Sequence, residues 1–183
     1  NNNAGPIVSR RAMDIAIEMA QTNGIGIVGA RNRSPFILAG YYPRKAAEQG
    51  LIGINFGPGG YIDIPAYGGM DLIMSTNPTG VAVPSKDGPV VLDMAFSSLG
   101  AGGWGSKRNR LEGLPWFKDG ILSKEGVPTT DINEALQGIL TCFGGHKGAG
   151  LSLMLDLIIR PLVGGKIDNA DPRIRSMLFI ALR

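Results

Sequence analysis

The residues of this chain that could do chemistry gather in one glycine-rich stretch, Gly144-Gly145-His146-Lys147-Gly148-Ala149-Gly150, which opens onto an apolar segment. No Ser, Thr, Asp or Asn stands in the stretch to cap a following helix, so the first N–H groups of that helix are expected to be free for another acceptor. Glycine permits close approach, the helix dipole favours an anion and Lys147 adds a positive charge, so a phosphate or carboxylate would fit. A second interpretation stays open: a tightly packed left-handed glycine connection with Lys147 in solvent.

The apolar segment that follows predicts a helix with one narrow polar line. Ser152, Asp156 and Arg160 are each four residues apart, and almost every other side chain is apolar, so the helix is expected to be buried on most sides. Asp156 precedes Arg160 in the favourable i,i+4 orientation. Pro161 predicts that the helix ends or kinks there.

A second chemical candidate is the single acid of the apolar run Val90–Phe96. Asp93 lies in a predicted buried strand, where a carboxylate must be paired or bound to something. It either accepts hydrogen bonds from backbone N–H groups or contacts a ligand, and the sequence leaves both open.

Composition excludes several classes of site. With one histidine and one cysteine, a Ser-His-Asp triad or Cys-His dyad would have to use His146, and His146 with Cys142 at i,i+4 makes an implausible zinc site, so no metal is expected. A lone cysteine allows no intramolecular disulfide and suits a reducing compartment, so we expect a cytoplasmic protein.

Partner classes are excluded by charge and hydropathy. The net charge is +3, and the one basic cluster, Lys107-Arg108-Asn109-Arg110, lacks interleaved aromatics, so we expect no nucleic-acid partner. There is no signal peptide and no apolar run long enough for a bilayer, so we expect no membrane partner.

The pattern of elements predicts a mixed α/β fold. Ser9 is expected to cap a first helix that ends near Gly24; strand 25–30, helix 39–49 and strand 51–56 then form a βαβ unit. Asp87-Gly88 marks a hairpin between strands 79–83 and 90–96, and Asp131 with Glu134 has capping-box spacing. Gly100-Ala101-Gly102-Gly103-Trp104-Gly105 matches G-x-G-x-x-G, but no amphipathic helix follows, so a Rossmann fold is rejected.

The whole chain, 1–183, is expected to be one cofactor-binding domain of a longer protein. It starts without Met and stops in an apolar run, 177–182, which reads as a strand that needs partners.

Six blocks in order resemble the malate/L-lactate dehydrogenase family of the non-Rossmann type, which includes ureidoglycolate, sulfolactate, diketogulonate and piperideine-carboxylate enzymes. The resemblance runs from about Ser9 to Gly165 and covers the central part of a family member. The blocks are Ala39-Gly40-Tyr41-Tyr42, Gly50-Leu51-Ile52-Gly53-Ile54, Thr76-Asn77-Pro78, Leu92-Asp93-Met94-Ala95, Val127-Pro128-Thr129-Thr130-Asp131 and Gly144-Gly145-His146-Lys147-Gly148.

The resemblance implies a largely antiparallel sheet flanked by helices, a homodimer, and reversible NAD(P)H-dependent reduction of a 2-oxo acid to a 2-hydroxy acid. It implies that Asp93, Met94 and Ala95 line the cofactor and that the glycine stretch, Gly144, Gly145, His146, Lys147 and Gly148, contacts it. A dinucleotide pyrophosphate is the kind of anion that a free helix start binds. The sequence does not separate NAD from NADP and assigns no catalytic residue.

The chain also departs from the family pattern. Pro35 stands where the family has a histidine that handles the substrate proton, and proline cannot transfer a proton. Phe96, Gly103 and Gly59 replace a usual Thr, a frequent Lys and a cofactor-contacting Ser. These changes keep an alternative open: a non-catalytic or truncated relative that acts as a binding or structural domain.

Overall fold

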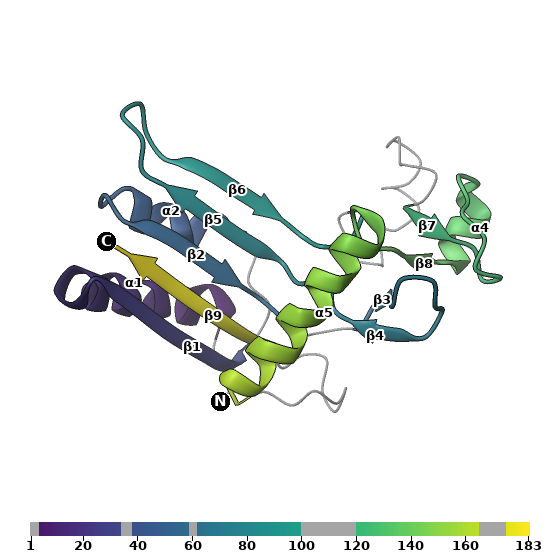
Figure 1. Ribbon diagram of the computed structural model, residues 1–183, viewed down its shortest axis with the longest axis horizontal. Helices are drawn as coiled ribbons and strands as arrows, with labels where there is room; N and C mark the ends of the chain where they lie inside the picture. Colours follow the sequence, from purple (N-terminus) through teal and green to yellow (C-terminus); the bar gives the residue numbers. More distant parts are fainter. Residues whose placement is uncertain (1–3, 34–37, 59–61, 100–119, 165–174) are drawn as a thin grey trace. The chain divides into compact units, whose positions relative to one another are not determined.

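The computed structural model describes residues 4–33, 38–58, 62–99, 120–164 and 175–183 (Figure 1). The chain divides into two compact units. The first comprises Asn1–Tyr61, Asn77–Met94 and Leu155–Arg183, and the second comprises Ile62–Thr76 and Ala95–Met154. The expectation that the two units act as one cofactor-binding domain stays a prediction.

The first unit is built on a five-stranded antiparallel sheet with the order β1-β9-β2-β5-β6. The last strand of the chain, β9, lies between β1 and β2 and pairs with both, so β1 and β2 run parallel with a strand inserted between them (Figure 1). The strands are β1 (Ile25–Arg33), β2 (Ile52–Phe56), β5 (Thr79–Val83), β6 (Val90–Met94) and β9 (Arg175–Leu182).

Two helices, α1 (Gly5–Asn23) and α2 (Tyr41–Ala47), cover one face of this sheet (Figure 1). Both approach it closely, because a Cβ at Gly26 would lie 2.0 Å from the carbonyl oxygen of Ala16 and one at Gly53 would lie 2.4 Å from that of Pro43. A core of fully buried side chains fills the space between the layers, with Met13 and Phe179 among the largest.

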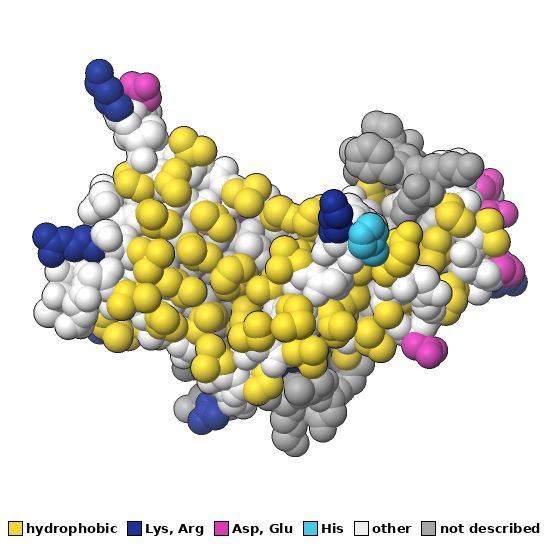
Figure 2. All heavy atoms as spheres, in the orientation of Figure 1, with side chains coloured by type: hydrophobic (Ala, Val, Ile, Leu, Met, Phe, Trp, Pro, Cys, Tyr) yellow, Lys and Arg dark blue, Asp and Glu magenta, His cyan; other side chains and the backbone are white. Residues whose placement is uncertain are grey.

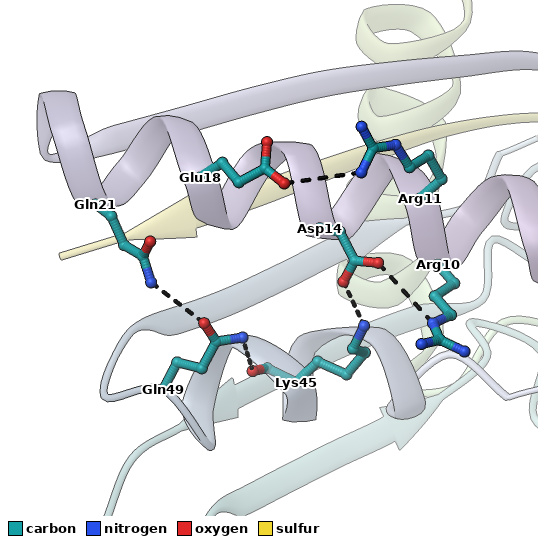
Figure 3. Close-up of polar contacts among 7 residues, drawn as sticks. All are labelled: Arg10, Arg11, Asp14, Glu18, Gln21, Lys45 and Gln49. Atoms are coloured by element: carbon teal, nitrogen blue, oxygen red, sulfur yellow. Dashed lines mark hydrogen bonds and ion pairs between the residues drawn. The ribbon is translucent and has the colours of Figure 1, made fainter.

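Polar contacts join the outer sides of α1 and α2 (Figure 3). Asp14 of α1 pairs with Lys45 of α2 and, more distantly, with Arg10. Gln21 donates to Gln49 at 3.2 Å. These contacts hold the two helices side by side over the core.

A third helix, α5 (Gly145–Leu162), passes over the opposite face of the sheet with its C-terminal half (Figure 1). Just after it, Val163 packs on β1, since a Cβ at Gly29 would come within 2.8 Å of its side chain. On the same face, further along the strand order, Asp156 of α5 accepts a hydrogen bond from Asn77, which lies just before β5. The helix therefore covers only one end of this face.

The second unit consists of short elements around two small apolar clusters. One centres on Ile64, Met74, Cys142 and Ala149, and the other on Ile121, Ala135 and Leu140. Its strands pair two by two, β3 with β4 and β7 with β8. The elements are β3 (Ile64–Pro65), β4 (Leu72–Met74), β7 (Ile121–Leu122), α4 (Ile132–Gln137) and β8 (Ile139–Leu140). None of the helices in the described part of the chain is both long and apolar enough to cross a bilayer.

The structure confirms the mixed α/β class, the antiparallel sheet, the 79–94 hairpin and the terminal strand's need for partners. Asp131 caps α4 as predicted, accepting from the N–H groups of Asn133 and Glu134. The second half of the capping box was wrong, because the Asp131 N–H donates to Thr129 and the Glu134 carboxylate accepts from Thr129. Ser9 as a helix cap was wrong: α1 begins at Gly5 with a proline in its first two positions, and Ser9 is buried inside the helix. The G-x-G-x-x-G match lies outside the described residues.

Candidate functional site

The glycine-rich stretch is a helix start rather than a loop. α5 begins at Gly145, so His146, Lys147 and Gly148 lie in its first turn, and the expectation that the helix begins only after Gly150 was wrong. Gly144 and Gly145 have φ values of 64° and 60°, a left-handed conformation that suits glycine. The stretch thus combines a left-handed glycine connection with a helix start whose preceding residue, Gly144, has no side chain to cap it.

Packing explains why the helix can start among glycines. A Cβ at Gly148 would lie 1.8 Å from the carbonyl oxygen of Phe143, so only glycine fits there. Gly150, by contrast, has open space around it. The close contact at Gly148 agrees with the tight-packing interpretation.

The first turn of α5 carries uncompensated positive charge. Lys147 is exposed and forms no ion pair with any described residue, and the first turn contains no acid. The ring of exposed His146 meets the edge of Tyr67 at 5.7 Å between centroids. The dipole and the lysine charge together favour an anion at this helix start.

The segment after β6 pairs with the segment that leads into this helix. Phe143 N donates to Phe96 O at 2.9 Å, Ser98 N donates to Thr141 O at 2.9 Å, and the rings of Phe96 and Phe143 are 5.2 Å apart. Ala95, the predicted cofactor neighbour, therefore directly precedes a strand-like pair that ends beside the glycine stretch.

Ser97 is a candidate that the sequence analysis missed. Its hydroxyl oxygen is buried without a hydrogen-bond partner, and it bridges to Cys142 through the backbone. A buried hydroxyl without a partner costs free energy, so this is a position where a bound ligand could supply the missing hydrogen-bond partner. Nothing local in the sequence distinguishes Ser97 from Ser98.

Asp93 lies on the edge strand β6 and is exposed, so the expectation of a buried strand was wrong at this point. Its Oδ2 accepts a hydrogen bond from the backbone N–H of Gly40 at 2.7 Å. Gly40 is required for this contact, because a Cβ there would lie 2.9 Å from that of Asp93. Of the two alternatives for Asp93, the structure therefore contains the backbone hydrogen bond, and the ligand role stays a prediction.

The polar line of α5 is buried, but the expectation that the helix is buried on most sides was wrong, because the opposite, apolar side is 47–63% exposed. Arg160 Nε donates to Asp156 Oδ1 at 2.6 Å and Asn77 Nδ2 donates to Asp156 Oδ2 at 3.1 Å, while Arg160 Nη2 is buried without a partner. Asn77 has a positive φ of 41° and is 1% exposed. Asn77 belongs to the Thr76-Asn77-Pro78 block of the family resemblance, but its contact with α5 could not be predicted from the sequence.

The predicted cofactor residues divide between the two units. Asp93 and Met94 end the β6 strand of the first unit, and Ala95 with 144–148 belongs to the second. Pro35, Gly59 and Gly103, where the chain departs from the family pattern, lie outside the described residues. Within the described ranges, no group of three or more His, Cys, Asp or Glu side chains could hold a metal ion.

Comparison with known sequences matches the whole chain, residues 1–183, to the family model described as malate/L-lactate dehydrogenase. A malate dehydrogenase from Pyrococcus horikoshii is 40% identical over 169 residues, which are 88% of this chain and 46% of the relative. An L-sulfolactate dehydrogenase from Methanothermobacter thermautotrophicus is 37% identical over 93% of this chain and 49% of the relative. The chain thus spans about half the length of the curated relatives it matches.

Solved structures give the same result. The sulfolactate dehydrogenase from Methanocaldococcus jannaschii superposes with a TM-score of 0.85 at 31% identity, over 99% of this chain and 54% of that one. The Pyrococcus horikoshii malate dehydrogenase gives 0.80 at 34% identity, over 98% and 51%.

Proposed function

We propose a function from one premise: this chain belongs to the malate/L-lactate dehydrogenase family. The function is that of an oxidoreductase, or of its cofactor-binding portion, that uses NAD or NADP for reversible reduction of a 2-oxo acid to a 2-hydroxy acid. The relatives support this class, since they include malate and sulfolactate dehydrogenases and a 2,3-diketo-L-gulonate reductase. The substrate class is a small 2-oxo or 2-hydroxy acid, and the lone buried Cys142 is compatible with the cytoplasm.

The start of α5 fits the pyrophosphate of a dinucleotide. Gly144 and Gly145 carry no side chains of their own over the backbone, and Lys147 is exposed without an acidic partner in the first turn. In our proposal, the first N–H groups of α5 and the ammonium of Lys147 bind the phosphate oxygens. This helix start is the single observation that carries the proposal.

The strand end Asp93-Met94-Ala95 is assigned to the remainder of the cofactor. Asp93 Oδ2 is held by Gly40 N–H, so Oδ1 remains to accept a hydrogen bond from a hydroxyl such as that of a ribose. The nicotinamide supplies the hydride chemistry when bound. No described side chain is assigned the proton transfer.

Lys147 gives the direct test. We expect Lys147→Gln to weaken NADH or NADPH binding about tenfold or more, because a charge-assisted hydrogen bond is worth roughly 1.5–3 kcal/mol and 1.4 kcal/mol is a factor of ten. Nicotinamide fluorescence follows the titration. Lys86→Gln, in the exposed β5–β6 turn, is the matched control and should leave the Kd within about twofold. Absence of binding at millimolar cofactor, or equal affinity for the Lys147→Gln variant, would count against the proposal.

One sequence observation, Pro35, favours the alternative of a relative that binds cofactor without turnover. If the purified chain reduces pyruvate or oxaloacetate, as monitored by the loss of NADH absorbance, this alternative is excluded. Tight cofactor binding without any such reduction would support it.

A further inference from the structure

The junction between α1 and β1 contains the one Asn-Gly pair of this sequence, Asn23-Gly24. Asn23 is the last residue of α1, and Gly24 alone separates the helix from β1, which begins at Ile25. Gly24 has a left-handed φ of 84°, and no non-neighbouring atom lies within 4 Å of the position that a Cβ would occupy. Both residues of the pair are exposed, so the pair is open to water.

An asparagine side chain in this position can react with the backbone that follows it. Its amide carbon, Cγ, is within reach of the backbone nitrogen of the next residue, and a bond between the two closes a five-membered ring. Glycine favours this attack, because it has no side chain beside its nitrogen and rotates more freely than any other residue. The amide of Asn23 is also free to react, since it forms no hydrogen bond with the described part of the chain.

We propose that Asn23-Gly24 is a modification site, at which the chain deamidates spontaneously through a succinimide. Gly24 N loses its proton and forms a bond to Cγ of Asn23, and the side-chain nitrogen leaves as ammonia. Water then opens the ring at either of its two carbonyls, which yields an aspartyl or an isoaspartyl residue at position 23. Water is the only co-reactant, so the reaction needs no oxidant, metal or cofactor.

The fold slows this reaction without blocking it. Gly24 N donates a hydrogen bond to Ala20 O at 2.9 Å, and the proton in that bond has to leave before the nitrogen can attack. The last turn of α1 must therefore open first. Helix ends open locally at a small fraction of the free energy of global unfolding. The rate of deamidation consequently reports how often the end of α1 opens.

The product does not fit the junction. An isoaspartyl residue adds one methylene to the main chain between α1 and β1, and the surrounding contacts leave β1 no room to slide. A Cβ at Gly26 would lie 2.0 Å from Ala16 O, and Gly24 O accepts a hydrogen bond from Arg183 N at 2.9 Å. Both products also place a new carboxylate at the C-terminal end of α1, where the helix dipole disfavours negative charge. Modification therefore loosens the attachment of β1 to α1.

A loosened β1 uncovers apolar surface. β1 is an edge strand of the described sheet and pairs with β9, and its Ile25 and Ile27 are already 47% and 48% exposed. Figure 2 shows hydrophobic side chains spread over the open face of the first-unit sheet. Detachment of β1 would leave the edge of β9 unpaired beside these side chains, and an unpaired apolar edge promotes aggregation. We expect the modified chain to be less stable and to aggregate.

Ageing of the purified chain in mildly alkaline buffer tests the proposal. Trypsin releases peptide 12–31, in which Asn23 is the single asparagine, and peptide 125–147, in which exposed Asn133 precedes Glu134 and is the matched control. Mass spectrometry should find that peptide 12–31 deamidates at least about tenfold faster than the control, because glycine leaves its nitrogen unobstructed. In guanidinium chloride, peptide 12–31 should react about tenfold faster again, because opening of α1 no longer limits the rate.

Asn23→Gln separates this modification from other effects of ageing, because its longer side chain would have to close a less favourable six-membered ring. The aged parent should lose about 2–4 °C in Tm and elute partly as aggregate in size-exclusion chromatography, whereas the aged variant should do neither. The proposal is overturned if the two peptides deamidate at the same rate, if folding gives no protection, or if aged Asn23→Gln loses as much Tm as the parent. None of these measurements depends on cofactor binding.

Discussion

The buried Asp156–Arg160 pair on α5 allows a sharp prediction of stability. Both side chains are under 8% exposed, and Asp156 is the acceptor for both Arg160 and Asn77. Asp156→Leu would leave a guanidinium in the interior without its counter-charge, and one of its nitrogens already lacks a partner. Removal of one member of such a pair costs about 3–5 kcal/mol of unfolding free energy.

The double variant tests whether the unpaired charge causes this loss of stability. Asp156→Leu with Arg160→Met removes both charges and should come within about 1–2 kcal/mol of the parent, because apolar residues often replace a buried pair at little cost. The coupling energy from the double-mutant cycle should therefore be at least about 2 kcal/mol. Urea denaturation monitored by far-UV circular dichroism provides the four unfolding free energies.

A matched control lies on α2. Arg44 and Glu48 form an i,i+4 pair at 2.8 Å with side chains 61% and 50% exposed. Replacing either by Ala should change stability by about 0.5 kcal/mol or less, because water screens the pair. The reasoning fails if Asp156→Leu costs less than about 1 kcal/mol, or if the buried cycle shows as little coupling as the exposed one.

Three further substitutions test the packing of the chain in the same urea assay. Gly148→Ala should lower the unfolding free energy by about 1–3 kcal/mol or more, because its Cβ would collide with the Phe143 carbonyl oxygen. Gly150→Ala, in open space on the same helix, should raise it by about 0.5–1 kcal/mol. Equal effects of the two substitutions would contradict the described packing at the start of α5. Asn55→Leu should cost about 2–4 kcal/mol, since its side chain donates to Ala39 O at 2.6 Å and accepts from Gly80 N at 3.0 Å inside the protein; a cost under 1 kcal/mol would disprove the bridge. Asp131→Ala should cost about 1 kcal/mol through loss of the α4 cap, and Asp131→Asn much less; equal losses would argue against capping.

Local chemistry in the sequence predicted the elements whose cause is local. Asp87-Gly88 gave the β5–β6 turn, with φ of 110° at Gly88, and Asp131 gave the α4 cap. The same local reasoning failed at Ser9, because a proline further upstream starts α1 earlier than a favourable cap residue does. It also failed at the start of α5, which begins at Gly145 although glycine is a poor helix former.

Contacts between distant segments could not be predicted. The hydrogen bond from Gly40 to Asp93 joins residues 53 positions apart, and the partner of Asp156 on the β4–β5 connection is 79 positions away. Helical periodicity identified the polar line of α5 but not that it would face its own protein while the apolar side faces solvent. The periodicity of apolar residues shows that a helix has an apolar and a polar side, but it does not show which side the rest of the protein covers.

The position of β9 has a consequence for synthesis on the ribosome. β1 and β2 are not neighbours in the sheet, and the strand that joins them emerges last. Roughly 120 residues separate β2 from β9, so at about 5–20 residues per second the nascent chain waits on the order of 6–24 s with two strand edges unmatched. Until β9 is made, the edges of β1 and β2 that later pair with it are the surfaces that a chaperone would have to protect during translation.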